Sequence, residues 1–167
     1  MDFYHNNHFF TIDIKTKEKL KLAKDFDEEL KDLIWTSSGI YAMAYQKTKT
    51  QLFLIDPTNG VIKLVDNSPD NIDGFSISSN GSTIALLANT AESLKEIYTS
   101  SLSNYAPKPI TNFSNEILGW KVAQSEVITW KSDDGTIIEG ILHKPKDYDS
   151  KKKYPLLIAV HGGPTAV

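Results

Sequence analysis

The sequence predicts a mainly β protein, in which part of a β-propeller is followed by the first strands of an α/β layer structure. Three observations support this prediction. Short apolar runs alternate with turn residues, pairs of these runs recur every 40–45 residues, and the pattern changes after Trp120. Four strands at such a period are typical of propeller blades. The repeated part is long enough for two to three four-stranded blades, whereas a closed propeller needs at least about four blades.

The predicted hairpins follow one another along the chain. HFFTIDIKTKEKLKLA is a strand, a polar turn and a strand, and DLIWTSSGIYAMAY forms the next hairpin. QLFLIDPTNGVIKLVD repeats the first plan with a turn at Thr58–Gly60, and DGFSISSNGSTIALLAN repeats the second with a turn at Asn80–Gly81. EIYTSSLSNYAPKPIT begins a third copy of the first hairpin. Asn-Gly favours such turns because both residues tolerate the positive φ of a tight reversal.

Equivalent residues mark the repeat. Phe53 follows Phe10 by 43 residues, Tyr98 follows Phe53 by 45, and Gly81 follows Gly39 by 42. From this spacing we expect blade boundaries near residues 50 and 95. A β-sandwich with evenly spaced hairpins is the alternative, but two different hairpins recur in the same order, which favours blades. The dipeptide pattern of WD40 propellers is absent.

A second part begins near residue 121. SEVITWKSDDGTIIEGILHKP is a longer hairpin that turns at Asp134–Gly135, and a lysine-rich loop follows it. Leu156–Val160 is apolar throughout, which predicts a strand buried on both faces, as in a helix-covered sheet. We therefore expect residues 1–121 to be the C-terminal blades of a propeller. Residues 122–167 would be the N-terminal strands of a second, truncated domain.

The last candidate element is the corner His161-Gly162-Gly163-Pro164, directly after the predicted buried strand. Glycines permit a sharp turn and let a substrate approach the backbone closely. Amides freed from sheet pairing at such a corner can stabilise a developing negative charge, as an oxyanion hole does. A tight turn without chemistry is the alternative. The position after an apolar strand favours the oxyanion loop.

Residues 127–167 resemble the start of the catalytic domain in prolyl-oligopeptidase-family serine peptidases, in the branch of acylaminoacyl and dipeptidyl peptidases. The resemblance rests on a W-x-S-x-D-G-x-x-I-x-G hairpin and on K-Y-P-L-L-x-x-x-H-G-G-P. It implies a β-propeller joined to an α/β-hydrolase domain, and short peptides as substrates. It also implies that the Gly163 amide contributes to the oxyanion hole, that Gly162 and Pro164 shape the loop, and that His161 supports it.

The nucleophile that this family requires is not found in the sequence. A G-x-S-x-G serine, an aspartate and a histidine would form the triad. Gly74-Phe75-Ser76-Ile77-Ser78 lacks the second glycine and lies inside a predicted blade, so Ser76 is a poor candidate. We expect the triad beyond Val167 and an inactive chain without it. A non-enzymatic β-rich binding module and an esterase-type α/β hydrolase are the alternatives.

Composition narrows the remaining possibilities. The net charge of −3 disfavours nucleic acid or an anionic membrane as the main partner. The absence of cysteine excludes disulfides and thiolate metal sites, and we expect no cofactor and no metal, since the spacing of His5 and His8 does not complete a metal site. No secretory signal is recognisable at the start of the sequence, so we expect a cytoplasmic protein. The expected partners are a short peptide substrate and a second copy, bound through open sheet edges.

Overall fold

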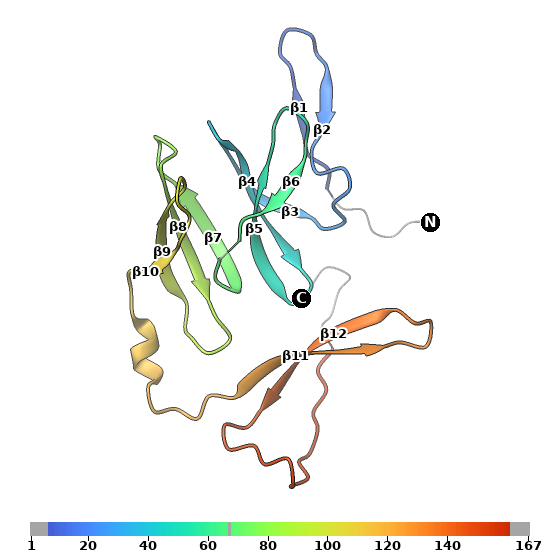
Figure 1. Ribbon diagram of the computed structural model, residues 1–167, viewed down its shortest axis with the longest axis vertical. Helices are drawn as coiled ribbons and strands as arrows, with labels where there is room; N and C mark the ends of the chain where they lie inside the picture. The colour runs from blue at the N-terminus through green and yellow to red at the C-terminus, as the bar shows by residue number, and fades with distance from the viewer. Residues whose placement is uncertain (1–6, 67, 161–167) are drawn as a thin grey trace.

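The computed structural model describes residues 7–66 and 68–160 and consists of β-strands, a short 3-10 helix and loops (Figure 1). The 3-10 helix is Phe113–Ile117. The strands, in chain order, are β1 (Phe10–Ile12), β2 (Lys19–Lys21), β3 (Leu30–Thr36), β4 (Gly39–Gln46), β5 (Lys49–Ile55), β6 (Ile62–Leu64), β7 (Asn71–Ile77), β8 (Thr83–Asn89), β9 (Glu96–Ser101), β10 (Lys108–Pro109), β11 (Gln124–Lys131) and β12 (Ile137–Lys144).

The centre of the molecule contains two antiparallel four-stranded units, β3–β6 and β7–β10, which lie side by side (Figure 1). A parallel pairing of Thr50 with Asn71 joins the two units. The division between the units therefore lies between β6 and β7. The boundaries expected near residues 50 and 95 are wrong, because β4 and β5 pair with each other, as do β8 and β9, and keep these positions inside a unit.

The predicted repeat of hairpins is confirmed by the strand pairing. Phe10, Phe53 and Tyr98 stand in β1, β5 and β9, and each of these strands pairs antiparallel with the strand that follows it. The repeat also includes a feature that the sequence did not indicate. The register of β3 shifts between Lys31 and Ile34, and that of β7 shifts at the equivalent place, between Ile72 and Gly74. The mainly β class is thus confirmed.

The three predicted turns are present. Gly60, Gly81 and Gly135 have φ angles of 74°, 68° and 86°, a backbone region in which glycine is not penalised. The first turn is also held by Asp56. Its carboxylate accepts hydrogen bonds from the amide of Thr58 at 2.8 Å and from the Asn59 side chain at 2.9 Å.

The core consists of two apolar clusters, of which one joins the two units and the other covers β4 and β5 with residues from the chain after β2. Successive residues of β4 point to opposite faces of the sheet, and both faces of β4 are buried. One apolar cluster includes Ile40, Ala42 and Phe53. The other includes Met43 from β4 and Ile84 from β8, and so spans the two units. Burial on both faces of a sheet is what a stack of blades requires, since each blade covers the next.

After β10 the chain leaves the two units. The connector, residues 110–123, contains the 3-10 helix and leads to the β11–β12 hairpin, which forms a separate two-stranded sheet (Figure 1). The strand expected at Leu156–Val160 is not formed: these residues lie in no helix or strand, and Leu157 and Val160 are 93% and 86% exposed. An apolar run becomes a buried strand only when neighbours pair with it and cover it, and no described segment does so here.

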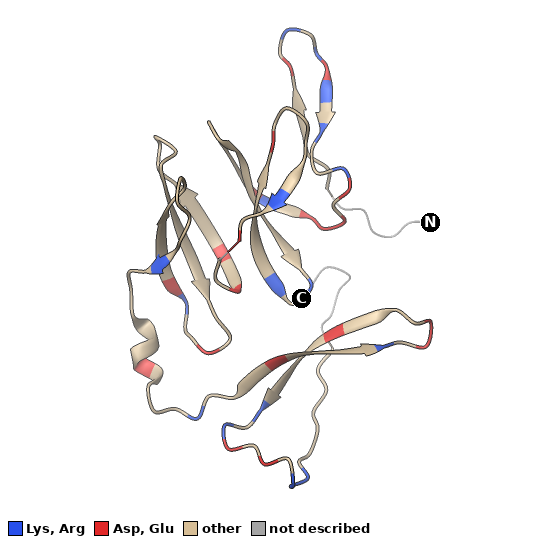
Figure 2. Cartoon of the chain, viewed as in Figure 1, with Lys and Arg blue, Asp and Glu red and all other residues tan. Residues whose placement is uncertain are grey.

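Charges of both signs are interspersed over the strands, turns and connector (Figure 2). Several oppositely charged side chains are paired, such as Lys49 with Asp70 at 2.6 Å and Lys95 with Asp73 at 2.8 Å. In residues 7–66 and 68–160, no helix is long and apolar enough to cross a membrane.

Candidate functional site

The predicted oxyanion residues His161, Gly162, Gly163 and Pro164 lie outside the described residues. The structure does describe the hairpin and the loop that lead to them. The first half of the motif that carried the family resemblance lies in this hairpin.

The turn of the hairpin is closed by Asp134. Its carboxylate accepts hydrogen bonds from the Ser132 hydroxyl and, at 2.9 Å, from the Thr136 amide. These bonds lower the pKa of Asp134 to about 2. The Gly135 amide donates to the Ser132 carbonyl at 2.9 Å, and the φ of 86° at Gly135 completes the reversal. The S-x-D-G part of the motif therefore builds the turn.

The tryptophan and the last glycine of the motif face each other across the hairpin. Ile128 pairs with Gly140 and Trp130 with Ile138, so Trp130 and Gly140 are diagonal neighbours on one face. A Cβ at Gly140 would lie 3.0 Å from Cζ3 and 3.1 Å from Cη2 of Trp130. Glycine therefore provides the room in which the indole ring packs against the neighbouring strand.

The far end of the hairpin holds a serine–histidine pair. Ser125 and His143 are directly opposite in the register, and the Ser125 hydroxyl lies 2.7 Å from Nδ1 of His143. A nucleophilic serine needs such a base, but it also needs a group that orients the base and donors for the oxyanion. Neither is found beside this pair among the described residues. The pair is therefore best explained as a cross-strand hydrogen bond of the hairpin.

An ion pair connects the hairpin to the four-stranded units. Nζ of Lys47, in the β4–β5 turn, lies 2.6 Å from a carboxylate oxygen of Glu139 in β12. The Lys47 side chain is 66% exposed and that of Glu139 is 19% exposed. Because the lysine is largely in water, this contact is worth little free energy, typically about 0–1 kcal/mol.

The site that sequence reasoning missed lies at the start of β9. Glu96 is nearly fully buried, and its carboxylate accepts four hydrogen bonds from Thr111, Phe113 and Ser114 of the connector. Loss of hydration raises the pKa of Glu96, but the bonds from Thr111, Ser114 and Phe113 outweigh this effect and lower the pKa to about 2. The sequence feature that could have indicated this site is Glu96 at the start of a strand, together with Thr111 and Ser114 after the next strand.

The other candidate catalytic and metal-binding residues do not form a site among the described residues. Ser76 is exposed on β7, and no histidine or carboxylate is bonded to it among the described residues. A search of the same residues finds no group of three His, Asp or Glu side chains that could hold a metal ion. The described surface includes hollows near two of these regions. One, of about 550 Å³, lies beside Glu96 and Tyr98, and the other, of about 410 Å³, lies between Trp35 and Asn80.

Comparison with known proteins finds similarity to three peptidases. No protein-family model matches the chain. The probable dipeptidyl-peptidase 5 of Aspergillus niger is 29% identical in an alignment that covers 86% of this chain and 20% of that protein. Dipeptidyl-peptidase 5 of Porphyromonas gingivalis is 25% identical over 93% of this chain and 23% of that protein. The uncharacterized peptidase YuxL of Bacillus subtilis is 24% identical over 78% of this chain and 20% of that protein.

These similarities extend over most of the chain and support a relationship to peptidases. The chain spans about a fifth of the length of the curated relatives that it matches.

Proposed function

We propose that this chain is part of a serine-type peptidase that hydrolyses short peptides through an acyl-serine intermediate. In this proposal residues 1–121 are the last blades of a β-propeller, and residues 122–167 are the first strands of an α/β-hydrolase domain. The nucleophile, its histidine and its aspartate belong to a segment other than this chain. The observation that carries the proposal is the similarity to peptidases over 78–93% of the chain.

The described residues support the proposal in two ways. The two four-stranded units repeat with the same strand order, as blades do. The W-x-S-x-D-G-x-x-I-x-G residues build a hairpin in which Asp134 closes the turn and Gly140 accommodates Trp130. These residues hold the hairpin together, and in this proposal they contribute no reacting group.

The chemistry that we assign to residues 161–164 is charge stabilisation. When a serine attacks a peptide carbonyl, the carbonyl oxygen becomes negatively charged, and a fixed N–H close to it lowers the barrier. Gly163 would donate this N–H, while Gly162 and Pro164 would set the loop and His161 would support it. Such a donor acts only on a charge that the nucleophile has created. The chain by itself is therefore expected to be inactive.

The test uses a fluorophosphonate probe and an aminoacyl anilide substrate. We expect no labelling and no acyl-enzyme burst with residues 1–167. In a dipeptidyl-peptidase-sized protein that contains this chain, we expect labelling of a serine outside residues 1–167. Stoichiometric labelling of Ser125 or Ser76 would overturn the proposal. Absence of labelling in the longer protein would favour the alternative, a β-rich binding module without activity.

The role of Gly163 is tested in the same longer protein. Gly163→Pro deletes the N–H, and we expect acylation to slow by roughly 10²–10³. Gly163→Ala keeps the N–H and serves as the matched control, with a much smaller effect. If the Gly163→Pro variant folds and acylates at the normal rate, residues 161–164 are a turn without a catalytic role.

A further inference from the structure

Each of the two oxygens of the Glu96 carboxylate accepts two hydrogen bonds from the connector. Oε2 accepts from the Thr111 hydroxyl at 2.5 Å and from the Phe113 amide at 3.0 Å. Oε1 accepts from the amide and the hydroxyl of Ser114 at 2.7 and 2.8 Å. A carboxylate has about four lone-pair positions, so its accepting capacity is used in full. Glu96 is therefore not available to a ligand in the neighbouring hollow.

The same two hydroxyls also accept hydrogen bonds from the backbone at the start of β9 and just before it. The Thr111 hydroxyl accepts from the Ile97 amide at 2.9 Å, and the Ser114 hydroxyl accepts from the Leu94 amide at 3.2 Å. Backbone amides on both sides of Glu96, at Leu94 and Ile97, are thus bonded to the connector as well. The ion pairs identified in the described part of the chain do not include Glu96. Its charge is balanced by hydrogen-bond dipoles, which depend on the connector staying in place.

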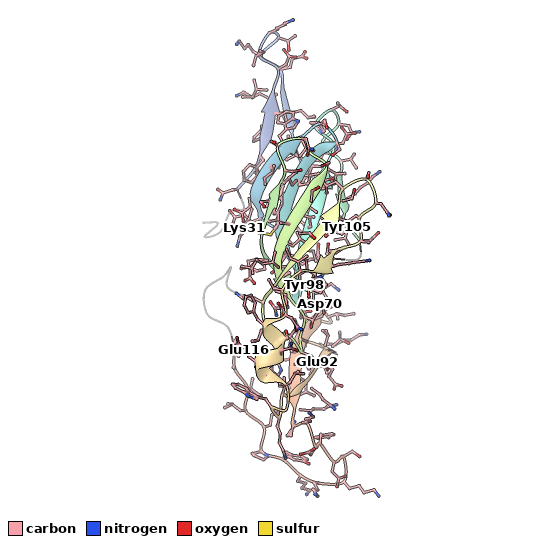
Figure 3. All side chains as sticks on the ribbon, turned by 90° about the vertical axis from the view of Figure 1, so that its left-hand side faces the viewer. Lys31, Asp70, Glu92, Tyr98, Tyr105 and Glu116 are labelled. Atoms are coloured by element: carbon pink, nitrogen blue, oxygen red, sulfur yellow. The ribbon has the colours of Figure 1, made fainter. Side chains whose placement is uncertain are left out.

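The carboxylate takes the place of a helix cap. Phe113 and Ser114 begin the 3-10 helix, where amides lack partners inside the helix. Asn112 holds the capping position, but its side chain makes no capping bond. Glu96 supplies the missing acceptor from another strand. Figure 3 shows the helix, which carries the labelled Glu116, below the strand that carries Tyr98.

We propose that Glu96 is a positioning residue that fixes the direction in which the chain leaves the four-stranded units for the β11–β12 hairpin. The proposal does not depend on peptide hydrolysis. The four bonds to Glu96 form at the point where the connector departs, whereas the Lys47–Glu139 pair is weak because its lysine is largely in water. Glu96 therefore has the larger influence on how the hairpin is oriented.

The first test measures amide hydrogen exchange in the full chain. Glu96→Gln replaces one oxygen by an NH₂ group, which faces donors and cannot accept their bonds. We expect the amides of Phe113 and Ser114 to exchange at least about tenfold faster, because each lost bond is one to a charged group. Amides of β4 and β5 should be unaffected. Glu92→Gln, which makes the same charge change at an exposed position, is the matched control.

The second test measures orientation. The chain has no cysteine, so Lys63→Cys on β6 and Asp133→Cys at the hairpin turn give a unique pair of spin-label sites, both exposed. We expect the distance distribution between the labels to broaden in Glu96→Gln and to stay narrow in Glu92→Gln. An unchanged distribution in Glu96→Gln would overturn the proposal. Faster exchange spread evenly over the strands would do the same, because it would show a general loss of stability.

Ser114→Ala is a milder variant that removes one hydroxyl and keeps the charge of Glu96. We expect it to speed exchange at Phe113 and in the connector by a smaller factor than Glu96→Gln. Unchanged exchange there would contradict the proposal, even if the Glu96→Gln chain did not fold.

Discussion

The residues at the motif positions each make a contact within the hairpin itself. They are Trp130, Ser132, Asp134, Gly135 and Gly140. Ser132 and Asp134 close the turn, Gly135 adopts the positive φ, and Trp130 packs over Gly140. Residues that are recognised together in a sequence need not react together. Here they maintain the register of two strands that precede the proposed oxyanion loop.

The contribution of Asp134 to stability should be lost only in acid. Its pKa is lowered to about 2 from a usual 3.8, so its contribution to stability is complete above the unfolded value and is lost as the pH falls through the folded value. We expect the Asp134 carboxyl resonance to titrate near pH 2, and exchange of the Thr136 amide to accelerate below about pH 4. A carboxyl midpoint at the usual value would contradict the hydrogen bonding described here.

Gly140→Val should displace the Trp130 ring. A Cβ at this position would meet the ring atoms at 3.0–3.1 Å, and the half-exposed ring can turn outward. We expect the nuclear Overhauser contacts between the ring and residue 140 to be lost, and the hairpin to lose about 0.2–1 kcal/mol of cross-strand packing. Ile141→Val, on the other face, is the control and should keep these contacts. Retained ring contacts in Gly140→Val would show that the two residues do not pack as described.

At the scale of elements, the β5–β6 turn joins more than its own two strands. The β5–β6 turn also meets the chain after β2: the Ala23 amide donates to the Gly60 carbonyl at 2.9 Å. The turn therefore links the β1–β2 hairpin to the next four-stranded unit. Position 60 combines a positive φ with close approach of another backbone, whereas position 81 has the first property alone.

Gly60→Ala should destabilise the chain more than Gly81→Ala. Both positions have a similar positive φ, which costs an alanine about 1–2 kcal/mol. A Cβ at residue 60 would also lie 2.7 Å from the Lys21 carbonyl oxygen, whereas the nearest atom to one at residue 81 is 3.8 Å away. Urea unfolding of the two variants measures the difference. Equal losses in free energy would mean that β2 yields to the new methyl group.

At the scale of the whole molecule, apolar surface is concentrated in the second part. Val127, Ile141 and Leu157 are at least half exposed, and Leu156–Val160 is paired with no described strand. Exposed apolar runs and open strand edges promote association. The four-stranded units, by contrast, cover each other through the cluster that contains Met43 and Ile84.

The chain should self-associate through Leu156–Val160. We expect light scattering to show a mass that rises with protein concentration, and Leu157→Glu to reduce this association because it places a charge in the apolar run. Lys152→Glu, which adds negative charge in the neighbouring loop, is the control for charge alone. A mass that stays that of a monomer at all concentrations, together with a cooperative melt, would show that these residues do not mediate self-association.

Local chemistry determined what could be predicted. Turn residues and alternating runs gave the hairpins, and the three turns with Gly60, Gly81 and Gly135 lie where the sequence placed them, because a positive φ is a property of one residue and its neighbours. The blade boundaries were misplaced, since the period alone does not say which neighbouring strands pair. The expected burial of Leu156–Val160 was wrong for a related reason. Apolar side chains are buried only where other segments pack against them, and composition does not show whether such segments are present.

The sequence by itself determined the β class, the repeat, the turns and the resemblance of the second part to peptidases. The tertiary structure decided how strands group into units, with the division between β6 and β7, and it alone revealed Glu96. The physical reason is range. A turn depends on adjacent residues, whereas the Glu96 carboxylate accepts bonds from donors 15–18 residues away, which lie beside it because β10 pairs with β9.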